Sequence, residues 1–186
     1  MGTSFYIVYG IWFLSEMLIS RLLRSGADDQ KGLDKRSLRV IWITVVLACT
    51  SGVFIPSYLY LPIFSDPSMR YLGLALILSG ILLRILVIRS LGKAFTADVT
   101  IRKNHMLKTD GPYRIVRHPS YAASLLSFVG FGFSLNNWLS LVLITVLIVM
   151  AFLYRIKIEE DALLQAFGDQ YIQYKKRTSK LIPFLV

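Results

Sequence analysis

The sequence predicts an all-α polytopic membrane protein with five transmembrane helices, and three observations lead to that class. Of its 186 residues, 55% are hydrophobic and only 17% are charged, whereas a soluble domain carries about 25% charged residues. The apolar residues gather in runs long enough to cross a bilayer, which takes about 20 residues of helix. Nineteen of the 21 Lys and Arg residues lie in or beside three polar stretches that separate or follow these runs, as the basic residues of cytoplasmic loops do.

Five segments are expected to span the bilayer: residues 4–23, 40–61, 71–90, 120–135 and 138–154. The last two are short and are joined only by Asn136 and Asn137, which predicts a helical hairpin. Beyond residue 154 the pattern becomes amphipathic, and Gly168 is the predicted helix stop. A short helix is expected at Asp169–Lys175.

One domain, residues 1–186, is expected, with its polar parts gathered into a cytosolic site formed by residues 92–119 and 155–186. Five spans with the basic stretches on one side place the N-terminus outside and the C-terminus in the cytoplasm. This distribution also accounts for the net charge of +10 without nucleic acid, because basic loops contact membrane lipids. The single cysteine, Cys49, excludes a disulfide framework and a cysteine metal site.

The segment Arg117-His118-Pro119-Ser120-Tyr121 is the first candidate site, where a basic loop enters the fourth span. Pro119 is expected to hold His118 in an extended conformation and to begin the helix. The free N–H groups of a helix start bind carboxylates or phosphates. The alternative is that Arg117 and His118 anchor the chain to lipid headgroups.

Arg155 and Glu159 lie four residues apart where the fifth span ends, so they share a helix face. An intrahelical ion pair or a solvated surface face would also explain them. His105 and His118 are thirteen residues apart with no nearby Cys, so no zinc site is expected.

Glu16 and Arg84 are charges inside predicted spans, at a similar depth. Charges in a membrane interior are costly and face partners or polar cavities. We therefore expect the two to pair with each other; the alternative is that one of them lines a substrate cavity.

Four blocks of residues, in this order and spacing, resemble the isoprenylcysteine carboxyl methyltransferase family over the last ninety or so residues. They are His105–Tyr113, Arg117–Tyr121, Arg155 with Glu159-Glu160, and Phe167–Tyr171, followed by Pro183. The resemblance implies an S-adenosylmethionine-dependent carboxyl O-methyltransferase whose cofactor pocket is closed by the loop, the hairpin and the C-terminal helix.

By this resemblance, Arg155 holds the substrate carboxylate. Cofactor contacts are implied for eight residues: His105, Leu107, Tyr113, His118, Pro119, Ser120, Tyr121 and Glu159. Lys108 departs from the usual apolar residue of the family at its position.

The chemistry of these residues fits that activity. A carboxylate acceptor is already ionised at neutral pH, so methyl transfer to it needs positioning and a dry cavity rather than a general base. Arg155 can grip a carboxylate with two parallel hydrogen bonds. The expected partner is a lipophilic carboxylate substrate that enters laterally from the bilayer between helices.

Three alternatives remain open at this point. An amine acceptor such as a phospholipid headgroup must lose a proton, for which His118 or Glu160 could serve, but Arg155 would be poorly placed beside a cationic headgroup. Nicotinamide-dependent membrane sterol reductases share an Arg-His-Pro-x-Tyr-like segment, but they are much larger. A non-catalytic membrane adaptor would use the basic loops only to bind anionic lipid.

Overall fold

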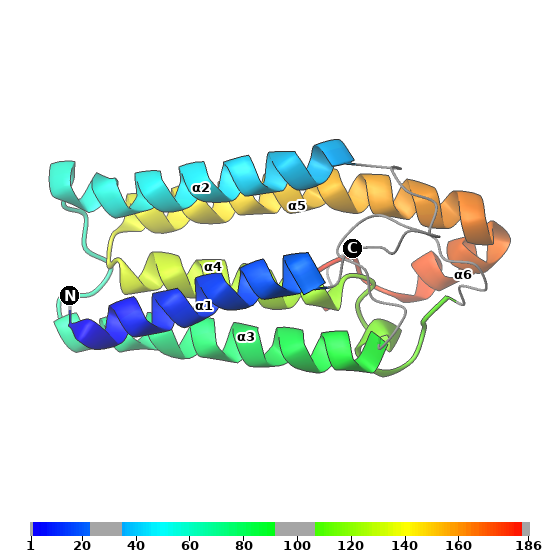
Figure 1. The fold of residues 1–186 in the computed structure, drawn as a ribbon, viewed down its shortest axis with the longest axis horizontal. Coiled ribbons are helices and arrows are strands. Elements are labelled where there is room, and N and C mark those ends of the chain that lie inside the picture. The colour runs from blue at the N-terminus through cyan, green and yellow to red at the C-terminus, as the bar shows by residue number, and fades with distance from the viewer. Residues whose placement is uncertain (1, 23–34, 92–106, 184–186) are drawn as a thin grey trace.

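The computed structural model describes residues 2–22, 35–91 and 107–183, and these residues form helices joined by short turns (Figure 1). The α-helices are α1 (Thr3–Leu22), α2 (Lys35–Tyr58), α3 (Arg70–Leu91), α4 (Pro119–Ser134), α5 (Trp138–Phe167) and α6 (Asp169–Arg177). Two short 3₁₀ helices are η1 (Pro67–Met69) and η3 (Gly111–Arg114). Within the described ranges the only β pairing is an isolated parallel bridge between Val116 and Ser179. The predicted all-α class is confirmed.

The five long helices run side by side along the longest axis of the molecule (Figure 1). α2 packs along α5, while α3 packs along α4 with α1 beside it. α6 lies at one end of this bundle, close to the loop that precedes α4. Residues 107–118 and α6 thus lie at the same end of the bundle, and a single site formed by residues 92–119 and 155–186 stays a prediction.

Four helices of the described chain are long and apolar enough to cross a membrane: Thr3–Ser20, Ser37–Tyr58, Pro67–Leu91 and Trp138–Phe167. The helix α4 has only 16 residues, and nine of them are buried between its neighbours. A span usually needs about 20 residues. A crossing by α4, and with it the count of five, therefore stays a prediction.

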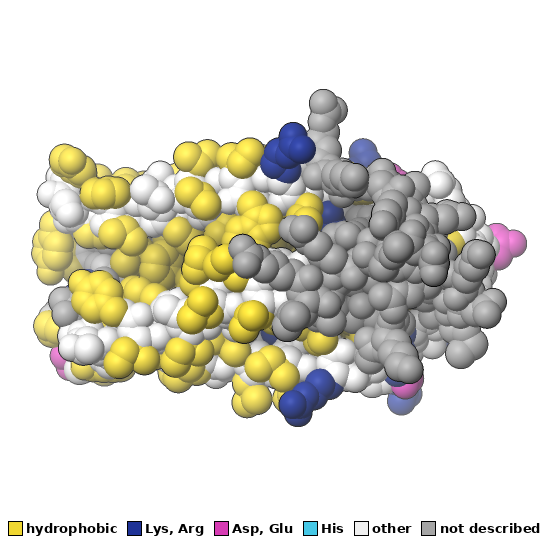
Figure 2. All heavy atoms as spheres, in the orientation of Figure 1, with side chains coloured by type: hydrophobic (Ala, Val, Ile, Leu, Met, Phe, Trp, Pro, Cys, Tyr) yellow, Lys and Arg dark blue, Asp and Glu magenta, His cyan; other side chains and the backbone are white. Residues whose placement is uncertain are grey.

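The outer surfaces of the long helices are apolar. Leu14, Leu82 and Met150 are 58%, 59% and 63% exposed, which water would disfavour and a bilayer would not. Figure 2 shows hydrophobic side chains over these helices, while the Lys and Arg side chains visible on this face lie toward the half that carries α6.

The predicted hairpin between α4 and α5 is present, and its two asparagines make different hydrogen bonds. Asn136 adopts a positive φ of 52°, which Asn tolerates better than most residues. Its side chain accepts hydrogen bonds from the N–H groups of Ile63 and Phe64, at 3.2 and 2.8 Å. The Asn137 side chain caps α5 by accepting a bond from the Ser140 N–H. The hairpin is thereby tied to the segment that follows α2.

The helix α5 continues without a break from the predicted fifth span through the amphipathic residues to Phe167. No helix-breaking residue precedes Gly168, which ends the helix with a positive φ of 49°, as predicted. The short helix that follows runs to Arg177, two residues beyond its expected end. The second span ends earlier than expected, at Tyr58 rather than residue 61.

Glu16 on α1 and Arg84 on α3 form the expected ion pair. The Arg84 Nη1 lies 3.0 Å from the Glu16 Oε2, and each side chain is 17% exposed. The Ser124 hydroxyl of α4 donates to the other Glu16 oxygen at 3.5 Å. The pair therefore links three helices, and both of its members also line the cavity described below.

Neutralising either member of this pair should destabilise the protein, because the remaining charge would be left largely buried without its partner. We expect the double variant Glu16→Gln/Arg84→Gln to lose less stability than the sum of the two single variants, with a coupling energy of about 1–3 kcal/mol. Thermal unfolding of the four proteins in one detergent measures this coupling. Strictly additive losses would show that the two charges do not meet.

Candidate active site

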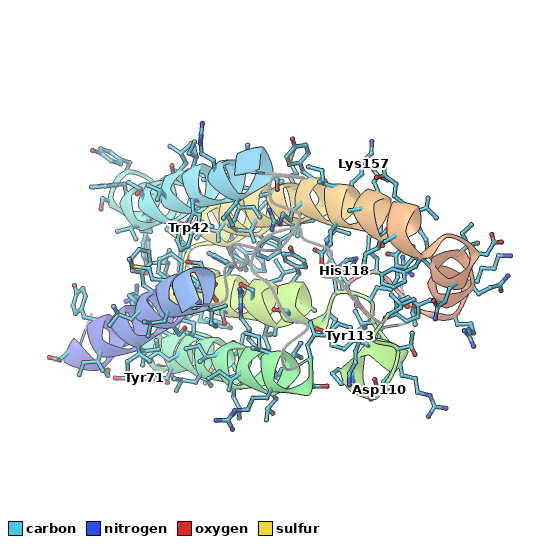
Figure 3. All side chains as sticks on the ribbon, turned by 45° about the vertical axis from the view of Figure 1, so that its right-hand side comes forward. Trp42, Tyr71, Asp110, Tyr113, His118 and Lys157 are labelled. Carbon is cyan, nitrogen blue, oxygen red and sulfur yellow. The ribbon has the colours of Figure 1, made fainter. Side chains whose placement is uncertain are left out.

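A cavity of about 450 Å³ opens between α1, α2, α4 and α5, a volume typical of small-molecule sites. Between α1 and α2 its walls are mainly apolar, with Trp12, Phe13, Ile41, Trp42, Val45 and Cys49 among the lining residues, although Glu16, Ser20 and Thr50 also line it. Its other end carries aromatic and charged side chains, among them Tyr113, His118, Tyr121, Arg155, Glu159 and Tyr171. Figure 3 shows Tyr113 and His118 at that end of the bundle and Trp42 on α2, farther from it. The cavity thus joins an apolar arm to a polar end.

Pro119 begins α4, as the sequence predicts, and His118 is the preceding cap residue. The expectation that His118 is extended is only partly right, because its φ of −122° fits but its ψ of 59° falls short of the roughly 120–160° usual before proline. The same stretch of chain is bonded to the C-terminal segment. The N–H groups of Arg117 and His118 donate to the carbonyl oxygens of Ser179 and Lys180, at 2.9 and 3.2 Å.

Arg117 is held inside the protein and is only 9% exposed. Its Nε donates to the Glu160 Oε1 at 3.0 Å, and its Nη1 donates to the carbonyl oxygens of Lys175 and Thr178. His118 is 4% exposed. The alternative in which Arg117 and His118 anchor the chain to lipid headgroups is therefore wrong.

His118 lies between two carboxylates of α5. Its Nε2 is 3.3 Å from the Glu160 Oε1, and its Nδ1 is 3.9 Å from the Glu159 Oε2. The second distance is too long for a hydrogen bond. The Nε2 edge of the imidazole is therefore held by Glu160, and the Nδ1 edge faces Glu159 without a hydrogen bond to it.

Arg155 and Glu159 do not form the intrahelical ion pair that their spacing allows, because the Tyr121 hydroxyl stands between them. The Arg155 Nε donates to the Tyr121 oxygen at 3.3 Å, and the Tyr121 hydroxyl donates to the Glu159 Oε2 at 3.0 Å. The Arg155 Nη1 donates to the Ser37 hydroxyl at 2.6 Å. Arg155 is only 2% exposed, so the solvated-face alternative is wrong for this residue.

The helix α6 contributes two tyrosines that were not predicted to belong to the site. Tyr171 and Tyr174 lie three residues apart, on one helix face, and both line the cavity. The Tyr174 hydroxyl donates to the Tyr113 carbonyl oxygen at 2.7 Å. Burial raises the pKa of Tyr174 to about 12, so this donor keeps its proton at neutral pH. The spacing of the two tyrosines in an amphipathic helix was the signal that could have found them.

Of the residues expected at the cofactor, the structure brings seven to the cavity wall: Leu107, Tyr113, His118, Pro119, Ser120, Tyr121 and Glu159. The eighth, His105, lies outside the described residues. Lys108 also lines the cavity, and its ammonium group pairs with Asp110 at 3.0 Å.

Comparison with known proteins places this site in a class. The sequence model of the family described as phospholipid methyltransferase matches residues 68–170. Protein-S-isoprenylcysteine O-methyltransferase B of Arabidopsis thaliana is 39% identical over 115 residues, which cover 61% of this chain and 58% of that protein. The protein-S-isoprenylcysteine O-methyltransferase of Schizosaccharomyces pombe is 36% identical over 132 residues, which cover 70% and 55%.

The fold agrees with a solved structure, that of the eukaryotic intramembrane Ras methyltransferase called isoprenylcysteine carboxyl methyltransferase. The TM-score is 0.68 at 26% sequence identity, over 95% of this chain and 66% of that one. Fold and site together place this chain among integral membrane proteins that share the architecture of this methyltransferase. The chain belongs to the family described as phospholipid methyltransferase, and its resemblance to the isoprenylcysteine carboxyl methyltransferases is confirmed. It spans less than two thirds of the length of these relatives.

Proposed function

We propose that this protein transfers a methyl group from S-adenosylmethionine to the carboxylate of a prenylcysteine-like or other lipophilic substrate at the cytosolic face of the membrane. The observation that carries the proposal is the position of Arg155. This buried cation contacts Ser37, which precedes Leu38 of the cavity wall, and Tyr121, which lines the polar end. A substrate with a carboxylate and an apolar tail would place its carboxylate at Arg155 and its tail along the apolar wall.

The residues at the polar end suit S-adenosylmethionine. The Glu159 carboxylate lines the cavity with 33% of its side chain exposed, and it can attract a cationic group. Tyr113 and Tyr171 offer aromatic faces. The buried Tyr171 hydroxyl has no hydrogen-bond partner among the described residues, which is costly unless a ligand or a shift of neighbouring groups supplies one.

Each group of the chain then has a definite task. S-adenosylmethionine supplies an electrophilic methyl group. Arg155 binds and orients the acceptor carboxylate, Tyr121 links that cation to Glu159, and Glu159 binds the cofactor. Walls of apolar and aromatic side chains exclude water, which keeps the anionic acceptor weakly solvated. No residue has to remove a proton from a carboxylate.

The apolar arm supports a lipid substrate. It lies between α1 and α2, helices whose outer surfaces are apolar, and it is continuous with the polar end. Burial of a prenyl chain there would contribute about 0.8 kcal/mol for each methylene removed from water.

An amine acceptor is the second candidate, because the matched family is described as phospholipid methyltransferase. Such an acceptor has to lose a proton, and His118 at the cavity wall could accept it. The buried positive charge of Arg155 disfavours a cationic headgroup at the same position.

The test is transfer of labelled methyl by the purified protein to a prenylated cysteine with a free carboxylate. The matched control is the same compound with its carboxylate converted to an amide. We expect a base-labile product from the acid only. Base-stable label on phosphatidylethanolamine would favour the amine acceptor. Binding of NADPH without methyl transfer would favour a reductase, and lack of both activities an adaptor.

We further propose five spans, with the N-terminus outside and the polar end of the cavity in the cytoplasm, from the asymmetry of basic residues. Single cysteines at Ser65 and Gln173 test this orientation, because both positions are exposed. The connection between α2 and α3, which holds Ser65, and α6, which holds Gln173, lie toward opposite ends of the bundle. In a Cys49→Ser background, an impermeant thiol reagent should label position 65 in intact cells and position 173 only after lysis. The reverse pattern would contradict the orientation.

A further inference from the structure

Two adjacent carboxylates of α5 have different surroundings. Glu159 lines the cavity, whereas Glu160 does not and is only 6% exposed. Glu160 therefore has no direct access to a ligand in the cavity. Any influence it has on the reaction must pass through another residue.

Glu160 is the meeting point of three segments of the chain. Its Oε1 accepts from the Arg117 Nε at 3.0 Å and faces the His118 Nε2 at 3.3 Å. Its Oε2 lies 3.1 Å from the Lys175 ammonium group of α6. The entry to α4, the cytosolic end of α5 and α6 are thus fixed to one carboxylate.

These contacts also determine where His118 carries a proton. An ionised carboxylate can only accept hydrogen bonds, and two cations beside Glu160 favour its ionised form. The His118 Nε2 must therefore be the donor. A histidine whose second nitrogen is held in this way has a fixed ring orientation and a fixed proton position.

We infer that Glu160 is a positioning residue, which holds the Nε2 proton of His118 and turns the Nδ1 edge of the ring toward Glu159 and the cavity. The inference rests on the proposed function, since it concerns how the cofactor end of the cavity is organised. It assigns separate roles to the two carboxylates: Glu159 faces the ligand, and Glu160 orients the imidazole from behind.

A purely structural role for Glu160, as a counterion for Arg117 and Lys175, leads to a different expectation. Replacing Glu160 would then lower stability without moving the proton on His118. The position of that proton separates the two roles, because a folding defect alone does not change it.

The experiment is nitrogen NMR of histidine-labelled protein in detergent, combined with calorimetry of S-adenosylhomocysteine binding. The chain has two histidines, so comparison with a His105→Gln sample assigns the His118 signals. In the unmodified protein we expect Nε2 to be protonated. In Glu160→Gln we expect a mixture of proton positions and about tenfold weaker binding, the effect of losing one well-placed hydrogen bond.

The control is Asp161→Asn, which removes a carboxylate from the next, exposed position of α5 and should change neither measurement. An unprotonated Nε2 in the unmodified protein would overturn the inference, even if Glu160→Gln does not fold. So would a Glu160→Gln protein in which the proton on His118 stays where it was. If the unmodified protein binds no S-adenosylhomocysteine, the proposed function fails, whereas the NMR result still decides the role of Glu160.

Discussion

Arg155→Ala should lower kcat/KM for a prenylated cysteine carboxylate about a hundredfold, the effect expected when one charge-assisted contact to a substrate is lost. The reason is that Arg155 is buried beside Tyr121 and Ser37, where its positive charge is weakly screened. Affinity for S-adenosylhomocysteine should stay close to the original value, because the proposed cofactor contact belongs to Glu159, which Arg155 reaches only through Tyr121. Methyl-transfer kinetics and calorimetry on the same preparation measure both quantities.

Two further variants sharpen this comparison. Glu159→Gln should weaken S-adenosylhomocysteine binding directly, whereas Arg155→Ala should leave that binding close to its original value. Lys157→Ala, an exposed position on the same turns of α5, is the matched control and should leave both quantities unchanged (Figure 3). Equal small effects of Arg155→Ala and Glu159→Gln would remove the proposed division of labour.

The long apolar helices and the pairing of Glu16 with Arg84 could be predicted because each rests on one strong physical constraint. Long apolar helices need lipid around them, and a charge inside lipid needs a partner at the same depth. The hairpin at Asn136-Asn137 could be predicted because two residues leave room only for a tight turn. Its bonds to Ile63 and Phe64 could not, since they join segments far apart in the sequence.

The presence of the expected residues at the cavity wall was predicted more completely than the hydrogen bonds between them. Seven of the eight expected cofactor residues reach the cavity, yet the hydroxyl of Tyr121 between Arg155 and Glu159 was not foreseen. Helical spacing says which side chains can meet within one helix, and it says nothing about a side chain that enters from another. The pairing of the C-terminal segment with Arg117 and His118 was missed for the same reason.

The position of the site depends on the packing of α3 against α4, because α4 carries Pro119 and its neighbours at one end. Glycines allow this close approach. A Cβ at Gly130 would lie 2.7 Å from the Gly73 carbonyl oxygen and 2.8 Å from the Ile77 backbone nitrogen. Small residues at such positions let two helix backbones come into contact within a membrane.

Gly130→Ala should therefore lower the free energy of unfolding by about 3 kcal/mol, the upper end of the range for overpacked positions. The colliding atoms belong to the backbone of α3 and cannot rotate away, so the helices must separate instead. Gly10→Ala is the matched control, because no atom lies within 4 Å of a Cβ placed there. In that variant the better helix propensity of alanine should leave stability unchanged or raise it by up to about 1 kcal/mol.

Thermal unfolding of both variants in the same detergent, with S-adenosylhomocysteine affinity measured in parallel, tests this prediction. Equal stability of the two variants would mean that the backbones of α3 and α4 are not in contact, and that the start of α4 is positioned by the hairpin and the C-terminal segment alone.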